Sequence, residues 1–297
     1  MAKKQMLDEL LVGQGLAADF LQARALIMAG TVYVDGRRET KAGECFPAAC
    51  KVEVRSNRPA YVSRGGLKLE KAAKLFAIDL TGLICMDVGA STGGFTDYML
   101  QHGAKMVYSV DVGYGQLDWK LRTDKRVVNM ERTNIRRLKA EMLAEKLDFA
   151  SVDVSFISLS KVLPVLAQIG KEHFHCVCLI KPQFEARREL VGKNGIVRDA
   201  RVHAEVLERV WDFTARYGFA VKGLTYSPIR GAKGNIEYLM YLQKDCHISE
   251  RTYREEDGQT HTLTEPAAAE QSQQRKALIS RLVVRSHANL DPGDKQE

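Results

Sequence analysis

The feature that most constrains the fold of this chain is the glycine-rich stretch at residues 84–97, which reads ICMDVGASTGGFTD. A short apolar run leads into three glycines that stand among small side chains, and a helical pattern follows them. This order predicts a buried strand, a tight turn and the start of a helix, which together open a doubly wound α/β sheet. Glycines allow a ligand to approach the backbone closely, and the N–H groups at a helix start can receive polar or anionic groups.

Acidic residues mark the ends of two predicted strands. Asp87 lies near the end of the first strand, and Asp111 closes the second, at residues 105–110, roughly 20 residues after the loop, where a nucleoside ribose commonly finds its acceptor. The loop has neither the dinucleotide spacing G-x-G-x-x-G nor the Gly-Lys-Ser/Thr ending of a phosphate loop. The pattern favours S-adenosylmethionine, and a nicotinamide cofactor is the alternative. The candidate cofactor-binding residues are Asp87, Gly89, Ala90, Ser91, Gly93, Gly94, Phe95, Asp111 and Asn134, the last as the adenine contact.

Composition narrows the class of protein. The net charge of +7 over 297 residues permits a polyanionic partner without demonstrating one. The six cysteines form no C-x-x-C pair, which favours thiols in a reducing cytosol and argues against a disulfide framework or a zinc site. We find no apolar run long enough to span a membrane and no signal peptide, so we expect a cytoplasmic protein without a membrane partner.

The first 58 residues follow their own pattern. Helical spacing at residues 6–12 and from Asp19 to Gly30 precedes a strand at 31–34, a tight turn at Asp35-Gly36 and a strand at 50–54. Two helices followed by a small β-ribbon resemble the S4 RNA-binding domain, on the segments LDELL, GLA, AR, IMAG and VYVDG. The candidate RNA-binding residues are Lys3, Lys4, Arg24, Arg37, Arg38 and Lys41, with Arg64 beyond them.

The rest of the chain divides by composition. We expect a linker at 59–64, an α/β domain at 65–245, a polar flexible insertion at 246–275 and a final helix and tail at 276–297. Within the α/β domain, helical spacing occupies 67–76 and 203–217, and strands are predicted at 127–130, 149–154 and 176–180. Two last strands, 219–226 and 237–242, form a terminal antiparallel hairpin. This is the layout of a Rossmann-like methyltransferase with a mostly parallel sheet.

Four charged residues are candidates for catalysis: Lys68, Asp153, Lys181 and Glu237. Lys68 lies on the helix before the first strand of the sheet, and Glu237 opens the last strand. Asp153 and Lys181 lie at the carboxyl ends of neighbouring strands. All four lie in the motifs SRGGLK, DVSFIS, LIKPQFE and GNIEY, which together with the glycine loop and DVGYGQL resemble the TlyA (hemolysin A) family. That family joins an S4 domain to an FtsJ-type methyltransferase and 2′-O-methylates ribosomal RNA. The resemblance implies a Lys-Asp-Lys-Glu catalytic tetrad, S-adenosylmethionine as cofactor and ribosomal RNA or ribosomal subunits as partner, with cytidine as the expected target.

The chemistry agrees with that tetrad. A ribose 2′-hydroxyl is a poor nucleophile near neutral pH, and a lysine can act as its base when desolvation and a nearby cation lower the pKa of the amine. We assign Lys181 as the base and Lys68 as the cation that orients the 2′-oxygen. Asp153 positions Lys181, Glu237 balances Lys68, and no metal is required.

Other classes of protein fit the sequence less well. A dehydrogenase would add a substrate domain with a catalytic histidine, and none of the seven histidines stands in a recognisable motif. A pseudouridine synthase can carry an S4 domain but has no S-adenosylmethionine loop. A non-catalytic RNA-binding or ribosome-assembly factor would not need the tetrad, and a membrane-active haemolysin would need an amphipathic membrane helix. The oligomeric state stays open.

Overall fold

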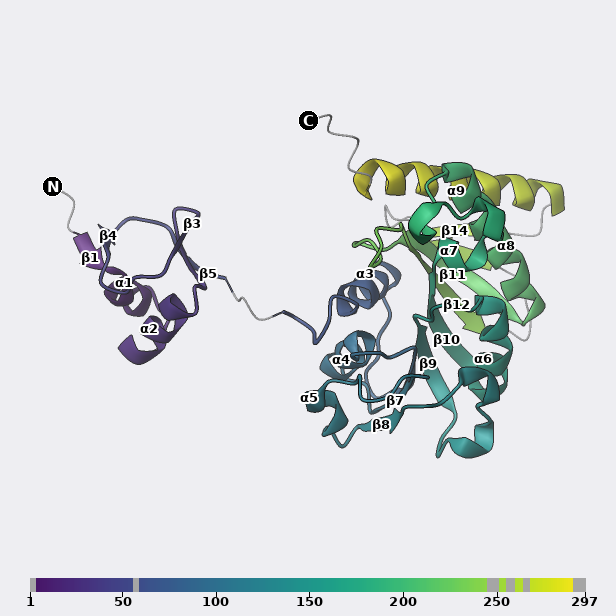
Figure 1. Ribbon diagram of the computed structural model, residues 1–297, viewed down its shortest axis with the longest axis horizontal. Coiled ribbons are helices and arrows are strands. Elements are labelled where there is room, and N and C mark those ends of the chain that lie inside the picture. The colour runs from purple at the N-terminus through teal and green to yellow at the C-terminus, as the bar shows by residue number, and fades with distance from the viewer. Residues whose placement is uncertain (1–3, 56–58, 245–250, 255–259, 264–267, 291–297) are drawn as a thin grey trace. The chain divides into compact units, whose positions relative to one another are not determined.

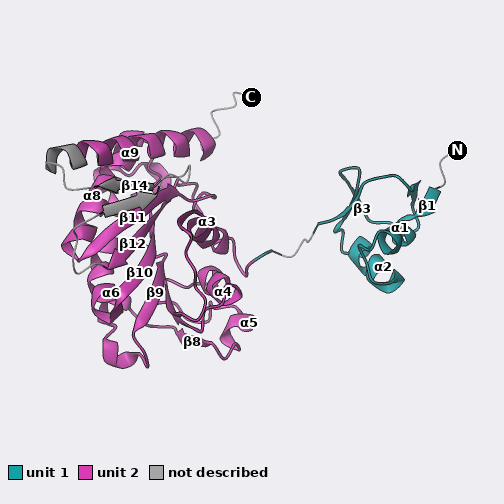
Figure 2. Cartoon of the chain, turned by 180° about the vertical axis from the view of Figure 1, so that it is seen from behind, with its two compact units in different colours: residues 1–60 teal, residues 61–297 magenta. Residues whose placement is uncertain are grey.

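The computed structural model describes residues 4–55, 59–244, 251–254, 260–263 and 268–290. The chain divides into two units, residues 1–60 and 61–297, which are coloured separately in Figure 2. Tyr61, which we placed in the linker, belongs to the second unit. Its ring is buried there, 5.5 Å from the ring of Tyr98.

In the first unit, the described residues form two helices and five short strands. These are β1 (Lys4–Met6), α1 (Leu7–Gly13), α2 (Phe20–Met28), β2 (Val32–Val34), β3 (Arg37–Glu39), β4 (Cys45–Pro47) and β5 (Val52–Val54). The side chain of Asp19 caps α2 by accepting a 2.7 Å hydrogen bond from the Gln22 N–H, as the sequence predicts. Asp35 and Gly36 both have positive φ, 48° and 83°, which a two-residue hairpin turn between β2 and β3 requires.

The second unit is built on a nine-stranded sheet with the order β14-β13-β11-β12-β10-β9-β6-β7-β8. The strands are β6 (Ile84–Val88), β7 (Met106–Val110), β8 (Val127–Met130), β9 (Leu147–Val152), β10 (Gly170–Ile180), β11 (Phe219–Tyr226), β12 (Tyr238–Lys244), β13 (Arg251–Arg254) and β14 (Thr260–Leu263). Strands β8, β7, β6, β9 and β10 run parallel, and β12 is antiparallel to both β10 and β11. This arrangement confirms the predicted parallel sheet with its terminal hairpin.

Helices cover both faces of this sheet (Figure 1). They are α3 (Gly66–Phe76), α4 (Gly94–Gln101), α5 (Trp119–Arg122), α6 (Leu163–Ile169), α7 (Pro182–Glu185), α8 (Ala200–Arg216) and α9 (Ala268–Leu290), with 3₁₀ turns η1 (Ile135–Arg137), η2 (Ala140–Met142), η3 (Leu159–Lys161), η4 (Arg188–Leu190) and η5 (Lys193–Gly195). Apolar residues of α3, α4 and α5 pack in one buried cluster, and those of α6, α8 and α9 pack in another on the opposite face. The chain leaves β6 toward β7 on one side and reaches β9 on the other, so the switch point lies between β6 and β9. Ligands of open α/β sheets bind outside the carboxyl ends of the strands at such a point.

The C-terminal segment differs from our prediction of a flexible insertion at 246–275. Strands β13 and β14 pair antiparallel within it, and β13 extends the sheet beside β11. Helix α9 begins at Ala268, eight residues before the predicted start at 276, because Ala, Glu and Gln are good helix formers even where apolar residues are few. The apolar face at residues 278–283 packs in the core as predicted. Residues 246–250, 255–259 and 264–267 of the predicted insertion lie outside the described residues.

Among the described residues, no helix has both the length and the apolar character needed to cross a lipid bilayer.

Candidate active site

The glycine loop between β6 and α4 is held tightly against its neighbours. Its backbone takes left-handed conformations at Gly89, Ser91 and Gly93, with φ of 86°, 48° and 95°. The Gly89 and Ala90 N–H groups donate to the Val110 carbonyl at 2.8 and 3.2 Å, which ties the loop to the end of β7. A Cβ atom at Gly89 would lie 2.4 Å from the backbone oxygen of Asp153. Only glycine therefore allows the loop to lie this close to the end of β9.

The side chain of Asp87 holds the start of helix α4, next to this loop, through hydrogen bonds. Its carboxylate, which the sequence predicts as a cofactor contact, is buried and accepts hydrogen bonds from the backbone N–H and the hydroxyl of Thr96, at 2.8 and 2.7 Å, and from the Ser151 hydroxyl at 3.4 Å. Thr96 is the third residue of α4, so Asp87 satisfies one of the free N–H groups at that helix start. The structure places Asp87 as a positioning residue for the loop, on the floor of a cavity.

Two cavities open at the carboxyl ends of the strands and meet at the glycine loop. The first, here named the tetrad cavity, has a volume of about 300 Å³ and is lined by Arg64, Lys68, Asp87, Gly89, Ala90, Ser91, Gly94, Phe95, Asp153 and Arg230, among others. The second, named the Asp111 cavity, has a volume of about 350 Å³ and is lined by Gly89, Ser91, Asp111, Asn134, Asp153 and Phe156, among others. Gly89, Ser91 and Asp153 line both, so a ligand extending from one to the other passes the loop.

Asp111 is oriented by two backbone donors. Its carboxylate accepts from the Ser91 N–H at 2.8 Å and from the Gly113 N–H at 2.6 Å. An ionised carboxylate has about four lone-pair sites, so two more hydrogen bonds can be accepted. The side chain of Asn134 accepts from the Arg136 N–H at 3.1 Å and caps η1 at the far side of the same cavity. The sequence-predicted cofactor residues thus surround two joined spaces, except that Gly93 packs against Leu121 behind the loop.

The four predicted catalytic residues come together in one chain of ion pairs. Lys68 on α3 lies with its Nζ 2.7 Å from Oε2 of Glu237 and 3.5 Å from Oδ2 of Asp153. On the other side, Oδ1 of Asp153 is 2.5 Å from Nζ of Lys181, which also donates to the Ser155 hydroxyl at 3.0 Å. Asp153 and Lys181 directly follow β9 and β10, and Glu237 directly precedes β12. Asp153 therefore links the side chains of Lys68 and Lys181 through its two carboxylate oxygens.

Burial and charge act in opposite directions on this cluster. Burial lowers the pKa of Lys68, but the carboxylates of Asp153 and Glu237 outweigh it, so the pKa of Lys68 is raised. Burial likewise raises the pKa of Glu237, and the ammonium of Lys68 opposes that rise. The raised pKa keeps Lys68 a cation at neutral pH, fixed by two acidic partners.

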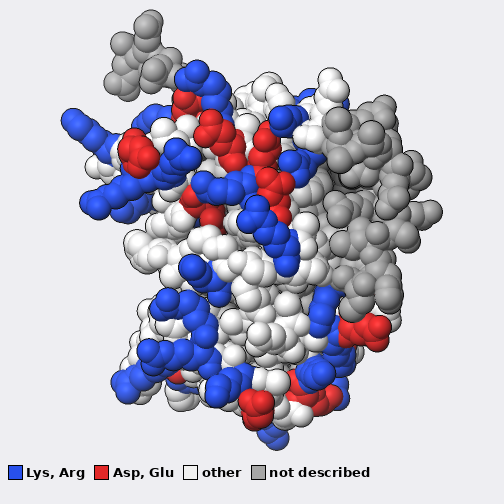
Figure 3. Space-filling model, turned by 90° about the vertical axis from the view of Figure 1, so that its right-hand side faces the viewer, with Lys and Arg blue, Asp and Glu red and all other residues white. Residues whose placement is uncertain are grey.

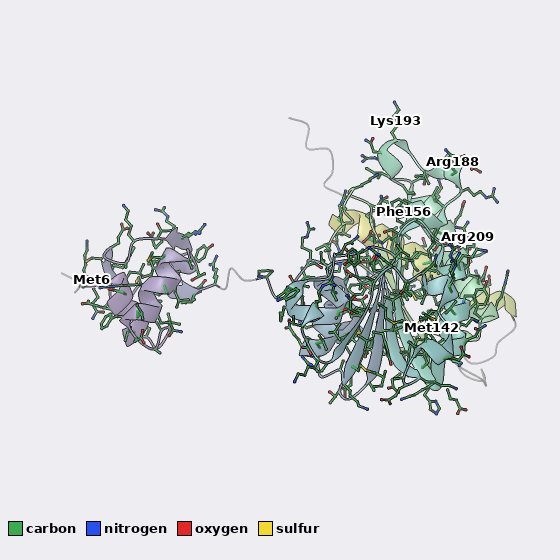
Figure 4. All side chains as sticks on the ribbon, turned by 60° about the horizontal axis from the view of Figure 1, so that its bottom comes forward. Met6, Met142, Phe156, Arg188, Lys193 and Arg209 are labelled. Atoms are coloured by element: carbon green, nitrogen blue, oxygen red, sulfur yellow. The ribbon has the colours of Figure 1, made fainter. Side chains whose placement is uncertain are left out.

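The structure adds residues that our sequence interpretation missed. Ser155 contacts Lys181, and its place two residues after Asp153 in DVSFIS was the available signal. The buried carboxylate of Glu185 accepts from the Leu159 N–H and the Ser158 hydroxyl, at 2.7 and 2.8 Å, and so fixes the segment that follows β9. Phe156 in that segment is 85% exposed, has a φ of 66° and lies where the strands converge (Figure 4).

The predicted RNA-binding residues are distributed over both units of the chain. Arg24 pairs with the buried Asp8 at 2.9 Å, while Lys4, Arg37, Arg38 and Lys41 are exposed in the first unit. Lys3 lies outside the described residues, and Arg64 lines the tetrad cavity of the second unit. On the face drawn in Figure 3, Lys and Arg side chains stand in separate groups with acidic and uncharged surface between them.

No group of three or more His, Cys, Asp or Glu residues in the described part of the chain is arranged to hold a metal ion.

Comparison with known proteins identifies the family of the chain. Residues 61–244 match the family described as FtsJ-like methyltransferase, and that match spans both cavities and all four tetrad residues. The chain belongs to this family. The resemblance to TlyA proteins is confirmed as well, because relatives of that name align with most of the chain.

Several relatives of the methyltransferase are similar over nearly their whole length. The chain is 53% identical to the candidate rRNA methyltransferase YqxC of Bacillus subtilis over 81% of this chain and 86% of that protein. It is 42% identical to the 16S/23S rRNA (cytidine-2′-O)-methyltransferase TlyA of Mycobacterium tuberculosis, over 82% and 91%. A solved structure of a candidate hemolysin from Streptococcus thermophilus matches with a TM-score of 0.67 and 42% identity, covering 97% of this chain and 98% of that one.

The buried Asp87 of the methyltransferase makes stability depend on pH. Burial raises the pKa of Asp87 to about 7, against the opposing hydrogen bonds of Thr96. Between about pH 4 and 7 the folded protein thus holds a proton that the unfolded chain has released, so this group's contribution to the unfolding free energy falls by roughly 4 kcal/mol as pH rises through that window. The amide side chain of the Asp87→Asn variant is neutral at every pH in this window. The unfolding free energy of the variant therefore does not show this decline.

We therefore expect the stability loss of Asp87→Asn relative to the wild type to be larger near pH ~5 than near pH ~7.5. Urea unfolding of both proteins at the two pH values measures this difference. An equal loss at both values, or a larger one at the higher value, would show that Asp87 is ionised throughout.

Proposed function

We propose that this methyltransferase transfers a methyl group from S-adenosylmethionine to a ribose 2′-hydroxyl of ribosomal RNA, with cytidine as the target nucleoside. The observation that carries the proposal is the Lys68–Asp153–Lys181–Glu237 cluster, of which Lys68 and Asp153 line the tetrad cavity and Asp153 also lines the Asp111 cavity. Such a pair of lysines bridged by carboxylates suits an oxygen nucleophile that must lose a proton during attack.

The cofactor would occupy the Asp111 cavity and reach past the glycine loop. The volume of about 350 Å³ lies within the range of roughly 300–1,000 Å³ that small-molecule sites occupy. Asp111 would accept the ribose hydroxyls, and Asn134 would lie toward the adenine. The methionine end would follow Gly89, Ala90 and Ser91 into the tetrad cavity, which brings the sulfonium methyl group toward Asp153, the partner of Lys181.

The tetrad and the methyl donor account for every bond and proton in the proposed reaction. The 2′-oxygen attacks the methyl carbon in line with sulfur, a C–O bond forms, and the C–S electron pair returns to sulfur to give S-adenosylhomocysteine. The proton of the 2′-hydroxyl passes to the amine of Lys181, and Asp153 holds that nitrogen in place. Lys68 remains a cation because its pKa is raised, so it can stabilise the negative charge that develops on the 2′-oxygen.

The substrate class is supported by the relatives and by the exposed basic residues. The names of the Mycobacterium tuberculosis and Campylobacter jejuni TlyA proteins give rRNA cytidine 2′-oxygens as their targets. We infer that residues 1–60 form an S4-like RNA-binding unit and that the enzyme acts in the cytoplasm on ribosomal RNA or ribosomal subunits. The target nucleotide would be drawn out of its stack to reach the tetrad.

Transfer of the labelled methyl group from S-adenosylmethionine to purified ribosomal subunits tests the proposal. We expect label in ribosomal RNA and none in transfer RNA offered at the same concentration. Absence of label from every ribosomal particle, with S-adenosylmethionine binding shown by calorimetry, would contradict the proposed substrate.

A further inference from the structure

A small basic cavity lies beside the tetrad cavity. Its volume of about 120 Å³ is well below the roughly 300 Å³ at which sites for whole small molecules begin, so it fits a compact group. Its polar lining consists of Arg198, Arg230, Lys233 and the imidazole of His287, and none of the described residues that line it is Asp or Glu. A space of this size and charge suits a single phosphate.

The basic cavity and the tetrad cavity share one residue. Arg230 lines both, and it belongs with Lys233 to the loop that joins β11 to β12 and ends at Glu237 of the tetrad. Glycine at position 231 permits this close packing, because a Cβ atom there would lie 2.4 Å from a carboxylate oxygen of Glu237. An anion in the basic cavity would thus lie one short loop away from the reacting groups.

Hydrogen bonds hold the walls of the basic cavity in place. The buried amide of Asn235 donates to the Gly195 carbonyl at 2.9 Å and accepts from the Val197 N–H at 3.0 Å, which joins the loop of Arg198 to the loop of Lys233. Arg230 donates to the carbonyls of Leu290 at 2.5 Å and Gly234 at 3.2 Å. The cavity is therefore formed before any ligand binds, which lowers the entropy lost on binding.

The chemistry of RNA indicates which phosphate group would occupy the basic cavity. The 2′-oxygen and the 3′-phosphate are carried by neighbouring carbons of one ribose, so a nucleotide that presents its 2′-hydroxyl to Lys181 brings a phosphodiester close to the tetrad. The tetrad itself contains two lysines and two carboxylates, so its net formal charge is not positive and it offers that phosphate no net attraction. Arginine and lysine residues outside the tetrad can attract the phosphate by their positive charge, and arginine also recognises phosphate through paired N–H donors.

We propose that Arg198, Arg230 and Lys233 bind the phosphodiester next to the target ribose and so set the register in which the 2′-oxygen meets Lys181. This inference rests on the proposed function and adds to it the anchoring point of the RNA backbone. It assigns these residues to substrate binding rather than to proton or methyl transfer.

The test uses the full chain with the double substitution Arg198→Ala/Lys233→Ala, which leaves the structurally engaged Arg230 intact. We expect the KM for ribosomal RNA to rise on the order of tenfold and the slope of its salt dependence to fall by about one for each lost contact. The KM for S-adenosylmethionine should change by less than about twofold, because neither residue lines the Asp111 cavity. Lys125→Ala is the matched control, because Lys125 is exposed at the amino end of β8, on the edge of the sheet away from the tetrad.

A chemically altered substrate identifies the phosphate. Replacing the phosphodiester next to the target ribose by an uncharged methylphosphonate should weaken RNA binding by the wild type but weaken it no further for the double variant. RNA affinity is read by fluorescence anisotropy with S-adenosylhomocysteine present, so this arm does not depend on methyl transfer. A double variant that behaves like Lys125→Ala, or that loses as much affinity as the wild type on neutralisation, would overturn the phosphate site and leave the proposed reaction untouched.

Discussion

Lys181→Ala is expected to slow methyl transfer by about 10²–10⁴-fold, the range that a positioned general base contributes. The affinity for S-adenosylmethionine should stay within about twofold, because Lys181 is not among the residues that line the Asp111 cavity. Single-turnover rates with saturating RNA and cofactor, together with calorimetric titration of S-adenosylmethionine, measure the two quantities separately.

Lys161→Ala is the control for this prediction. Lys161 is an exposed lysine on η3, in the segment after β9 but outside the ion-pair chain, so its loss should change the rate by less than about twofold. A Lys181→Ala enzyme that turns over at the rate of the Lys161→Ala enzyme would refute the base assignment, and Asp153 would then be the group to examine.

Gly89→Ala should be nearly as damaging for a different reason. The added Cβ would lie 2.4 Å from the Asp153 carbonyl oxygen and 2.9 Å from its carbon, and the φ of 86° is unfavourable for any L-residue. Overpacking and backbone strain together predict a loss of about 2–4 kcal/mol in unfolding free energy. The displaced Asp153 should lower activity by at least about 10²-fold, since shifts near 1 Å at a reacting centre have effects of that size.

Gly82→Ala is the control for Gly89→Ala, because it introduces backbone strain without a contact to Asp153. Gly82 has a φ of 74° in the turn before β6, at the amino end of the sheet, and no described atom lies within 4 Å of its virtual Cβ. We expect a loss of about 1–2 kcal/mol from strain alone and nearly unchanged kcat. Thermal unfolding and kcat are measured for both variants; equal effects in the two would mean that the contact between the loop and Asp153 has no catalytic consequence.

The sequence predicted the parts of the fold whose patterns are local. The glycine loop, the apolar strands at 84–88 and 106–110 and the hairpin turn at Asp35-Gly36 each carry a short-range signal, and the structure has them. Strand β3 was missed because Arg37, Arg38 and Glu39 are polar and pair at a sheet edge without alternation. Strand β10 starts at Gly170, before the predicted residue 176, because polar residues at its start conceal the pattern.

Contacts between distant segments were harder to predict. That Lys68 on a helix would meet Glu237 could not follow from spacing over 169 residues, and it rested on the resemblance to a family. Asp87 was predicted correctly as a strand-end acid, yet its partners are Thr96 and Ser151. Whether a strand-end carboxylate faces a ligand or a helix N-terminus depends on the packing of the following helix, which the sequence does not express.

The position of the methyl group on the product tests the central claim most directly. Ribosomal RNA labelled by the wild-type enzyme is digested to nucleosides and separated by mass spectrometry against 2′-O-methyl and base-methyl standards. The account predicts that the label is in 2′-O-methylcytidine and is lost with Lys181→Ala. Label in a base-methylated nucleoside would retain the fold and the methyltransferase family but would contradict the role given to the tetrad.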